Sequence, residues 1–119
     1  MSRYRFVIVA AVLVVFVAVG AYLLFGNKSS GPQIVTINVT VTGGTSMKPP
    51  DLSAHHNDTV TINITSDTDG EVHLHGYDIA FEAKAGQVVS QTFKAVNTGD
   101  FPIEWESTST ELGHLIVNP

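Results

Sequence analysis

The chain of 119 residues contains no cysteine. It therefore has no disulfide, and it lacks the thiolate that a nucleophilic cysteine, a cysteine-ligated zinc ion or a blue-copper centre requires. Small exported domains often depend on disulfides. We expect this one to be held together by core packing alone, which an all-β domain of this size can achieve.

Basic residues are few, and three of the six lie before residue 30, namely Arg3, Arg5 and Lys28. Beyond residue 30, three lysines accompany all eleven carboxylates, which gives a formal charge of −8. So acidic a domain is a poor partner for nucleic acid or an anionic lipid surface. It is compatible with cations or a basic protein, and solubility alone is the simpler explanation of the charge.

The chain also lacks any helical periodicity after residue 25 and any Ser/His/Asp or paired-carboxylate arrangement typical of a catalytic site. We therefore predict that this protein is not an enzyme.

The one long apolar segment is residues 6–25, which contain no charge. At about 1.5 Å per helical residue they would span roughly 30 Å, the thickness of the hydrocarbon core of a bilayer. A cleaved signal peptide is the alternative, because Ala18, Val19 and Gly20 resemble a small-x-small cleavage site. The apolar residues continue to Phe25, which favours an uncleaved anchor.

The charges around this segment predict its orientation. Arg3 and Arg5 precede it, which places the N-terminus in the cytoplasm. The sequence thus predicts a single-pass membrane protein with an extracytoplasmic, periplasmic or extracellular domain. Its predicted parts are a cytoplasmic N-terminus (residues 1–5), a transmembrane signal-anchor helix (6–25), a linker (26–32) and the exported domain (33–119).

The exported part is patterned as strands. In residues 35–41 and 59–65, β-branched apolar residues alternate with Thr and Asn, which is typical of half-buried strands. Shorter apolar segments separated by Gly, Asn and Asp clusters follow, whereas residues 45–57, with Pro49 and Pro50, are predicted to be a loop with room for a short extended piece. The pattern predicts an all-β, antiparallel sandwich of about seven strands.

The segment most suggestive of chemistry is Glu71-Val-His-Leu-His-Gly-Tyr-Asp78. In a strand, His73 and His75 point to the same side with Cα atoms roughly 6.5 Å apart, so their imidazoles could share a copper, zinc or nickel ion. Two ligands bind weakly, so a third is needed. The main candidates are His114 and Glu111, followed by Asp78, Met47 and the pair His55 and His56.

The alternative for these histidines is structural: one packs and the other faces water. A third His, Asp or Glu close to both rings would favour a metal site, whereas backbone groups capping each ring would not.

Five segments together resemble the cupredoxin superfamily. They are residues 58–65 (DTVTINIT), 71–79 (EVHLHGYDI), 84–87 (KAGQ), 98–105 (TGDFPIEW) and 112–117 (LGHLIV). The chain is most similar to small bacterial membrane-anchored or secreted cupredoxin-like domains of the plastocyanin and azurin type. The resemblance covers residues 33–119 and implies a Greek-key β-sandwich.

The resemblance also implies where copper ligands would lie. His75 matches the histidine that ends a strand before a short turn, and the other ligands, Cys, His and Met, would come from the turn between the last two strands. Here Trp105 replaces the cysteine, residues 106–111 contain no histidine, and Glu111 replaces the methionine. The resemblance therefore implies a domain without type-1 copper, which would not be an electron carrier.

Two functions remain open. The first is a membrane-anchored extracytoplasmic module that binds or transfers copper, not of type 1, through His73 and His75. The alternative is a metal-free structural or protein-interaction domain that is accessory to a membrane complex. The sequence specifies neither the protein partner nor the oligomeric state.

Overall fold

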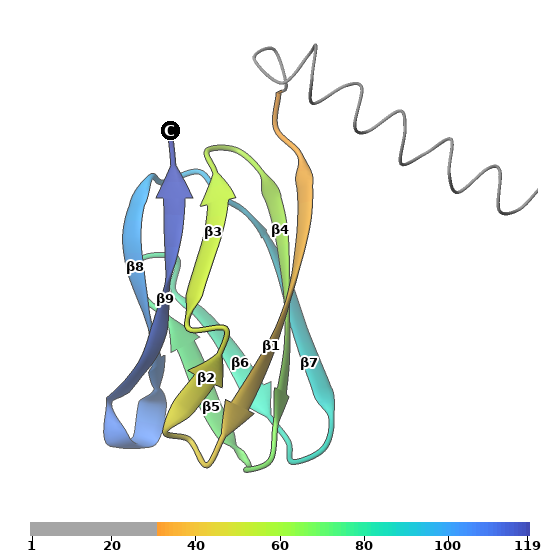
Figure 1. Ribbon diagram of the computed structural model, residues 1–119, viewed down its shortest axis with the longest axis vertical. Coiled ribbons are helices and arrows are strands. Elements are labelled where there is room, and N and C mark those ends of the chain that lie inside the picture. Colours follow the sequence, from red (N-terminus) through yellow and green to blue (C-terminus); the bar gives the residue numbers. More distant parts are fainter. Residues whose placement is uncertain (1–30) are drawn as a thin grey trace, which may run out of the picture. The chain divides into compact units, whose positions relative to one another are not determined.

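Nine β-strands and a short 3-10 helix form residues 31–119, the part of the chain that this computed structural model describes (Figure 1). The predicted anchor at residues 6–25 lies outside the described residues. Within residues 31–119 there is no helix long and apolar enough to cross a membrane. The elements are β1 (Ile34–Thr42), β2 (Ser46–Lys48), β3 (Asp51–His55), β4 (Thr59–Ser66), β5 (Gly70–Leu74), β6 (Ile79–Ala83), β7 (Val88–Lys94), β8 (Gly99–Trp105), η2 (Glu106–Thr108) and β9 (Thr110–Asn118).

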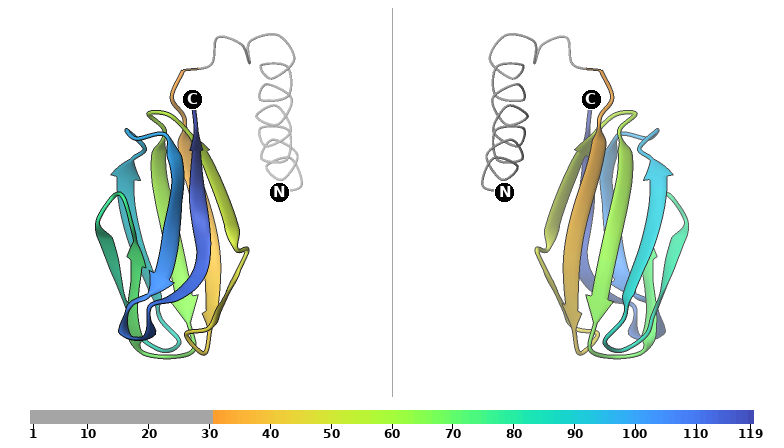
Figure 2. Two further views of the ribbon diagram at one scale, coloured as in Figure 1. Left: turned by 90° about the vertical axis from the view of Figure 1, so that its left-hand side faces the viewer. Right: turned by 90° about the vertical axis from the view of Figure 1, so that its right-hand side faces the viewer.

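The strands form two sheets that face each other (Figure 2). One sheet has the order β2-β1-β4-β7 and the other the order β3-β9-β8-β5-β6. The predicted all-β sandwich is therefore confirmed, but the prediction that it is antiparallel throughout is wrong. The pairs β1–β4 and β3–β9 are parallel. After β1 the chain crosses to the second sheet as β3 and returns as β4 pointing the same way as β1.

The predicted loop at residues 45–57 contains two strands, so the described domain has nine strands where about seven were expected. β2 pairs with the end of β1, and β3 runs along β9. In these strands Met47, Leu52 and Ala54 are buried. Their alternation is only three and five residues long and is interrupted by Pro49 and Pro50, which are typical of loops. The hydrogen bonds of neighbouring strands, remote in sequence, decide the conformation here.

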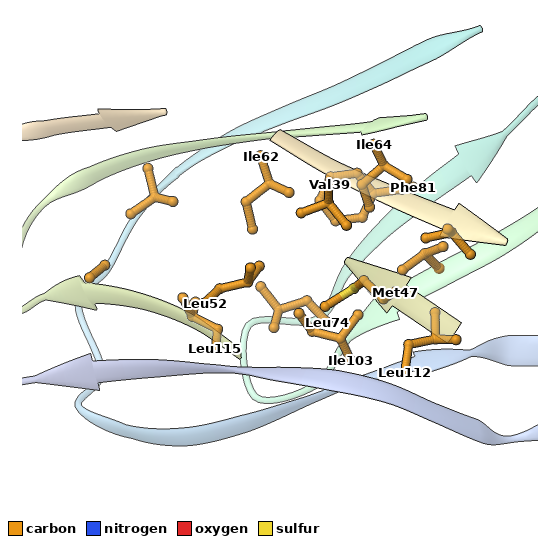
Figure 3. Packing of buried hydrophobic residues seen from close by; sticks show 14 of the residues in the cluster. Val39, Met47, Leu52, Ile62, Ile64, Leu74, Phe81, Ile103, Leu112 and Leu115 are labelled. Carbon is orange, nitrogen blue, oxygen red and sulfur yellow. The ribbon is translucent and has the colours of Figure 1, made fainter. Parts of the chain in front are cut away.

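The core between the sheets contains the alternate aliphatic residues that the sequence pattern indicates. Ile62 and Ile64 from β4 face Leu74 and Leu115 from the other sheet, and each is at most 1% exposed (Figure 3). Burying such a side chain contributes about 1.5–3 kcal/mol, so this cluster can stabilise the domain without disulfides. Met47, one of the possible metal ligands, is 4% exposed within this core. Its thioether therefore packs between the sheets, away from both histidines of the motif.

Candidate metal site

Strand β5 presents the histidine motif on the outer face of the five-stranded sheet. Val72 and Leu74 are fully buried, while His73 between them points outward. His75 follows the last residue of β5, and its ring meets that of His73 edge-on, with centroids 4.4 Å apart and an interplanar angle of 74°. The predicted strand is confirmed as far as Leu74, and His75 lies just beyond its end in the turn that follows.

A tight turn after His75 brings a carboxylate back to the motif. Gly76 has a φ of 83°, and a Cβ on it would lie 2.3 Å from Cδ1 of Phe101, so only glycine fits. The chain then reverses into β6. This reversal places Oδ1 of Asp78 3.1 Å from Nε2 of His73.

Strand β8 and the short helix η2 that follows it each supply one more carboxylate. His73 is level with Glu104 in the antiparallel pairing of β5 and β8. Oε1 of Glu104 lies 2.9 Å from Nε2 of His75, and Oε2 of Glu106 lies 3.7 Å from Nδ1 of His73. The ring contacts of both histidines are thus with carboxylates, and neither ring is capped by the backbone. The absence of a backbone cap is what a metal site requires, but each carboxylate contacts only one of the two rings, so the arrangement meets the expectation for a metal site only in part.

One atom of the cluster has no hydrogen-bond partner. Nδ1 of His73 is buried and unpaired, although the His73 side chain as a whole is 19% exposed. Buried polar atoms are nearly always hydrogen-bonded, so an unpaired imidazole nitrogen facing a carboxylate is unusual. Its lone pair makes it a potential metal donor, although the atom itself is shielded from solvent.

As they stand, no three His, Asp or Glu side chains in residues 31–119 are arranged to hold a metal ion. His75 and Glu104 are within hydrogen-bonding distance of each other, so a proton occupies the place that a cation would take. Two imidazoles and one or two carboxylates are a donor set that suits Cu(II), whereas a blue-copper ion does not fit because its thiolate is missing. A cation would have to displace the proton and draw the carboxylate toward both rings.

His114 belongs to a different cluster. β9 and β5 are both neighbours of β8 and not of each other, so His114 lies two strands, roughly 10 Å, from the motif. Its Nε2 is 2.7 Å from Asp51 and its Nδ1 is 2.8 Å from Asp100. The hydrogen bond with Asp51 and the charge of Asp100 raise the pKa of His114. Both ring nitrogens are therefore engaged in an ion-pair clamp across β3, β9 and β8.

The other sequence candidates also lie apart from His73 and His75. Glu111 faces Glu104 across the β8–β9 pair, at an irregularity in the register, and is exposed. Among the described residues, no hydrogen bond or ion pair joins Glu111 to a histidine. His55 and His56 are exposed at the end of β3, which is three strands from β5.

Trp105, where the resemblance would place the copper-ligating cysteine, fills the end of the sandwich. It is 6% exposed, and its indole packs so closely on two glycines that a Cβ on Gly44 or Gly70 would lie 2.7 or 2.1 Å from the ring. Trp105 is level with Val72, so the turn that follows it lies beside the beginning of β5. His75 lies beyond the other end of β5. His75, which matches the first copper ligand, and residues 106–111, the turn that would carry the other ligands, therefore lie at opposite ends of β5.

The carboxylates of Glu104 in β8 and Glu106 in η2 were not among the sequence candidates. Glu104 and Glu106 flank the buried Trp105. Because side chains alternate between the two faces of a strand, the sequence alone would have allowed us to predict that both point to the outer face. Glu71 and Glu82 form a further pair there, opposite each other on β5 and β6. Burial raises the pKa of Glu71, and its hydrogen bond with Glu82 and the negative charges of Glu82 and Glu106 raise it further. The motif thus lies in an acidic field that attracts cations.

Comparison with known proteins identifies the fold. No protein-family model and no curated protein sequence matches the chain. Among solved structures it is similar to a copper-binding protein in its apo form, with a TM-score of 0.61 and 14% identity over 70% of this chain and 86% of the other. Auracyanin B gives a TM-score of 0.57 and 15% identity over 71% and 89%. A chain from the structure of a heme-copper terminal oxidase dimer gives 0.56 and 16% identity over 98% and 99%.

Proposed function

Because residues 32–119 have a cupredoxin-like fold, we propose that this protein is an extracytoplasmic cupredoxin-like module that binds Cu(II) through His73 and His75, outside any type-1 centre. The anchor predicted at residues 6–25 would hold it at the membrane. Glu104 and Glu106 complete the donor set in this proposal. The observation that carries it is the contact of the two imidazoles, 4.4 Å apart, with carboxylates at both rings and an unpaired Nδ1 on His73.

The position of the site supports binding and release rather than electron storage. The side chains of His73 and His75 are 19% and 40% exposed, so the pair lies at the protein surface, although a cation would have to move neighbouring side chains to reach the buried Nδ1 of His73. Imidazole and carboxylate ligands without a thiolate suit Cu(II) but do not produce the short copper–sulfur bond of an electron carrier. A module that takes up a copper ion and passes it to another protein uses this kind of open site.

Copper titration of residues 31–119 tests the proposal. This fragment contains the whole compact unit and its core, so it should fold without the preceding segment. We expect one Cu(II) ion to bind with micromolar or tighter affinity by calorimetry. Binding should weaken from pH 7.5 to pH 5, because imidazole and carboxylate ligands bind a metal ion only when deprotonated. Intense blue absorption is not expected, since there is no thiolate.

Matched histidine variants make the test specific. His75→Ala and His73→Ala should each weaken binding at least about tenfold, the scale on which ligand environments act. His114→Ala removes a histidine that is 33% exposed on the same face of the sheet, and it should leave the affinity unchanged. Binding no tighter than that of the urea-unfolded fragment, or equal loss in all three variants, would reject the site.

A second candidate function is that of an accessory chain in a membrane complex. The observation in its favour is the likeness to a chain of the heme-copper terminal oxidase dimer, which covers 98% of this chain and 99% of that one. The full chain, tagged and extracted in mild detergent, would then co-migrate with a haem-containing complex on a sizing column. Migration as a free small protein would argue against this role.

A further inference from the structure

A buried carboxylate holds together one end of the sandwich. Asp58 is 3% exposed, and its two carboxylate oxygens accept hydrogen bonds from the backbone N–H groups of Gln33 at 2.8 Å and His55 at 2.9 Å. The backbone carbonyl of Asp58 accepts a third hydrogen bond, from the N–H of Ala95 at 2.8 Å. β1 begins at this end, and β3 and β9 finish there (Figure 1). We call it the Asp58 end, and it consists of residues 32–34, 55–59 and 94–97.

Two of the three large hydrophobic residues that are exposed in residues 31–119 lie at the Asp58 end. Ile34 is 82% exposed and Val96 is 51% exposed. Each directly follows a residue whose backbone N–H group is bound by Asp58, so the backbone holds both side chains in place at the surface. The third, Val88, begins β7 at the opposite end. Single exposed aliphatic residues are common, so the meaning of this pair depends on the charges around it.

The Asp58 end has no exposed carboxylate. Asp58 is its one acidic residue, and Lys94 balances it, while the exposed His55 and His56 add two further basic groups. Seven of the eleven carboxylates of the chain lie toward the opposite end, where β4, β6 and β8 finish and β5 and β9 begin. The seven are Asp67, Asp69, Glu71, Glu82, Glu104, Glu106 and Glu111. Two lysines accompany these seven carboxylates, which leaves a formal charge of −5 there. The domain is thus polarised along its length, with a neutral end and an acidic end.

The neutral end is also where the chain enters the domain. Both backbone groups of Gln33 are bonded there, its N–H to the carboxylate of Asp58 and its carbonyl to the N–H of Thr59 at 2.8 Å. If residues 6–25 span the bilayer, as proposed above, the seven residues 26–32 connect the span to this point. Seven residues reach at most about 25 Å when fully extended, and a flexible chain of this length spans roughly 15 Å on average. The lipid surface is then within reach of the neutral end.

We propose that the Asp58 end is a lipid-facing surface, which rests in the headgroup region of the bilayer and fixes the orientation of the domain. This inference rests on the anchor in the proposed function. Ile34 and Val96 enter the apolar side of the headgroup region, and the ammonium group of Lys94 meets lipid phosphates. The acidic end points away from the bilayer and so avoids anionic headgroups. Two aliphatic side chains bind lipid weakly, but the tether maintains a high effective concentration, so a weak contact suffices.

This orientation also determines how the proposed copper site is presented. The strands run between the two ends of the domain, so both sheets stand upright on the membrane (Figure 2). The outer face of the five-stranded sheet, with His73 and His75, then faces sideways. A protein anchored in the same bilayer can approach the two histidines from that side without displacing the domain.

Fluorophore labelling of single introduced cysteines tests the orientation, because the chain has no cysteine of its own. The full chain is reconstituted into vesicles of phosphatidylcholine and phosphatidylglycerol, with and without lipids that carry a nitroxide quencher on the headgroup. Val96→Cys and Val88→Cys form a matched pair, since both replace an exposed valine. β7 separates the two positions by roughly 20 Å, so quenching should be at least about threefold stronger for the label at residue 96.

Ser29→Cys, in the linker, reports on the anchor independently. Strong quenching at residue 29 with equal quenching at residues 88 and 96 would overturn the lipid contact and leave the anchor intact. Absence of quenching at residue 29 would reject the anchor, and this proposal with it. Copper titration of residues 31–119 contains no lipid, so it is read separately from both results.

A charge at the Asp58 end tests the role of the aliphatic pair. Ile34→Asp should weaken the quenching of the label at Val96→Cys, because a carboxylate is expelled from the headgroup region. Val88→Asp makes the same kind of change at the opposite end and should leave that quenching unchanged. Circular dichroism checks that each variant has folded. Quenching that is insensitive to Ile34→Asp, or that falls equally in both variants, would overturn the proposal.

Discussion

Gly70 lies against the indole of Trp105, and replacing it with alanine tests how the end of the sandwich is filled. A Cβ at Gly70 would lie 2.1 Å from Cζ2 and 2.6 Å from Cη2 of the ring, so the indole would have to move. The ring also packs against Gly44, where a Cβ would lie 2.7 Å from it, so the indole has little space into which it could move. Inserting a methyl group into such packing costs about 1–3 kcal/mol.

This cost translates into a measurable shift. For a domain of this size, each kcal/mol lowers the melting temperature by about 4–8 °C, so Gly70→Ala should lower it by about 4–24 °C. The assay is thermal and urea unfolding of residues 31–119. Trp105 is the only tryptophan of the chain, so its fluorescence reports on this contact directly, and circular dichroism reports on the whole domain.

A double-mutant cycle separates the packing cost from any effect on the backbone. In a Trp105→Leu background the indole is gone, so Gly70→Ala should cost less than in the wild type by about 0.5–3 kcal/mol. An unchanged unfolding midpoint in Gly70→Ala would refute the close packing of the ring on this glycine. Equal costs in the two backgrounds would show that the destabilisation does not come from Trp105.

Two further predictions concern polar groups outside the motif. Asp58 is 3% exposed and accepts hydrogen bonds from the backbone N–H groups of Gln33 and His55. Asp58→Ala should therefore lower the free energy of unfolding, measured in urea, by about 1–3 kcal/mol. An unchanged free energy of unfolding would contradict this role. Because the pKa of His114 is raised, its ion pairs with Asp51 and Asp100 contribute their full stability below the ordinary imidazole pKa of 6.5 and lose it as the pH rises through the raised pKa. His114→Gln should therefore destabilise the domain more at pH 5.5 than at pH 9. A difference in urea unfolding that does not change with pH would refute the charged clamp.

The fold was predictable where one strand carries its own pattern. Residues 59–65 alternate without interruption, and β4 forms there with its apolar side chains buried. β3 could not be found in the same way, because Leu52 and Ala54 are only two apolar positions after a pair of prolines. Its parallel pairing with β9 joins residues more than sixty positions apart. Such pairing depends on the assembled sheet and leaves no local signal.

The candidate site was predictable to the same extent. The spacing of His73 and His75 is local, and a period of two suffices to place both rings on one face. Their carboxylate partners Glu104 on β8 and Glu106 in η2 depend on the register between β5 and β8, which are about thirty residues apart. His114 was a plausible ligand only while the strand order was unknown. With β8 between β5 and β9, its two ring nitrogens instead bind Asp51 and Asp100.

The packing of Trp105 separates metal binding from folding in this domain. The indole occupies the end of the sandwich and is buried against Gly44 and Gly70, so the core is complete without an ion. The proposed site lies on side chains of the outer face, none of which belongs to the core cluster. A bound cation would therefore stabilise the domain only by mass action, by about 2.7 kcal/mol at one hundred times its dissociation constant. If the proposed site binds copper, the ion would leave without unfolding the protein, as delivery of copper to another protein would require.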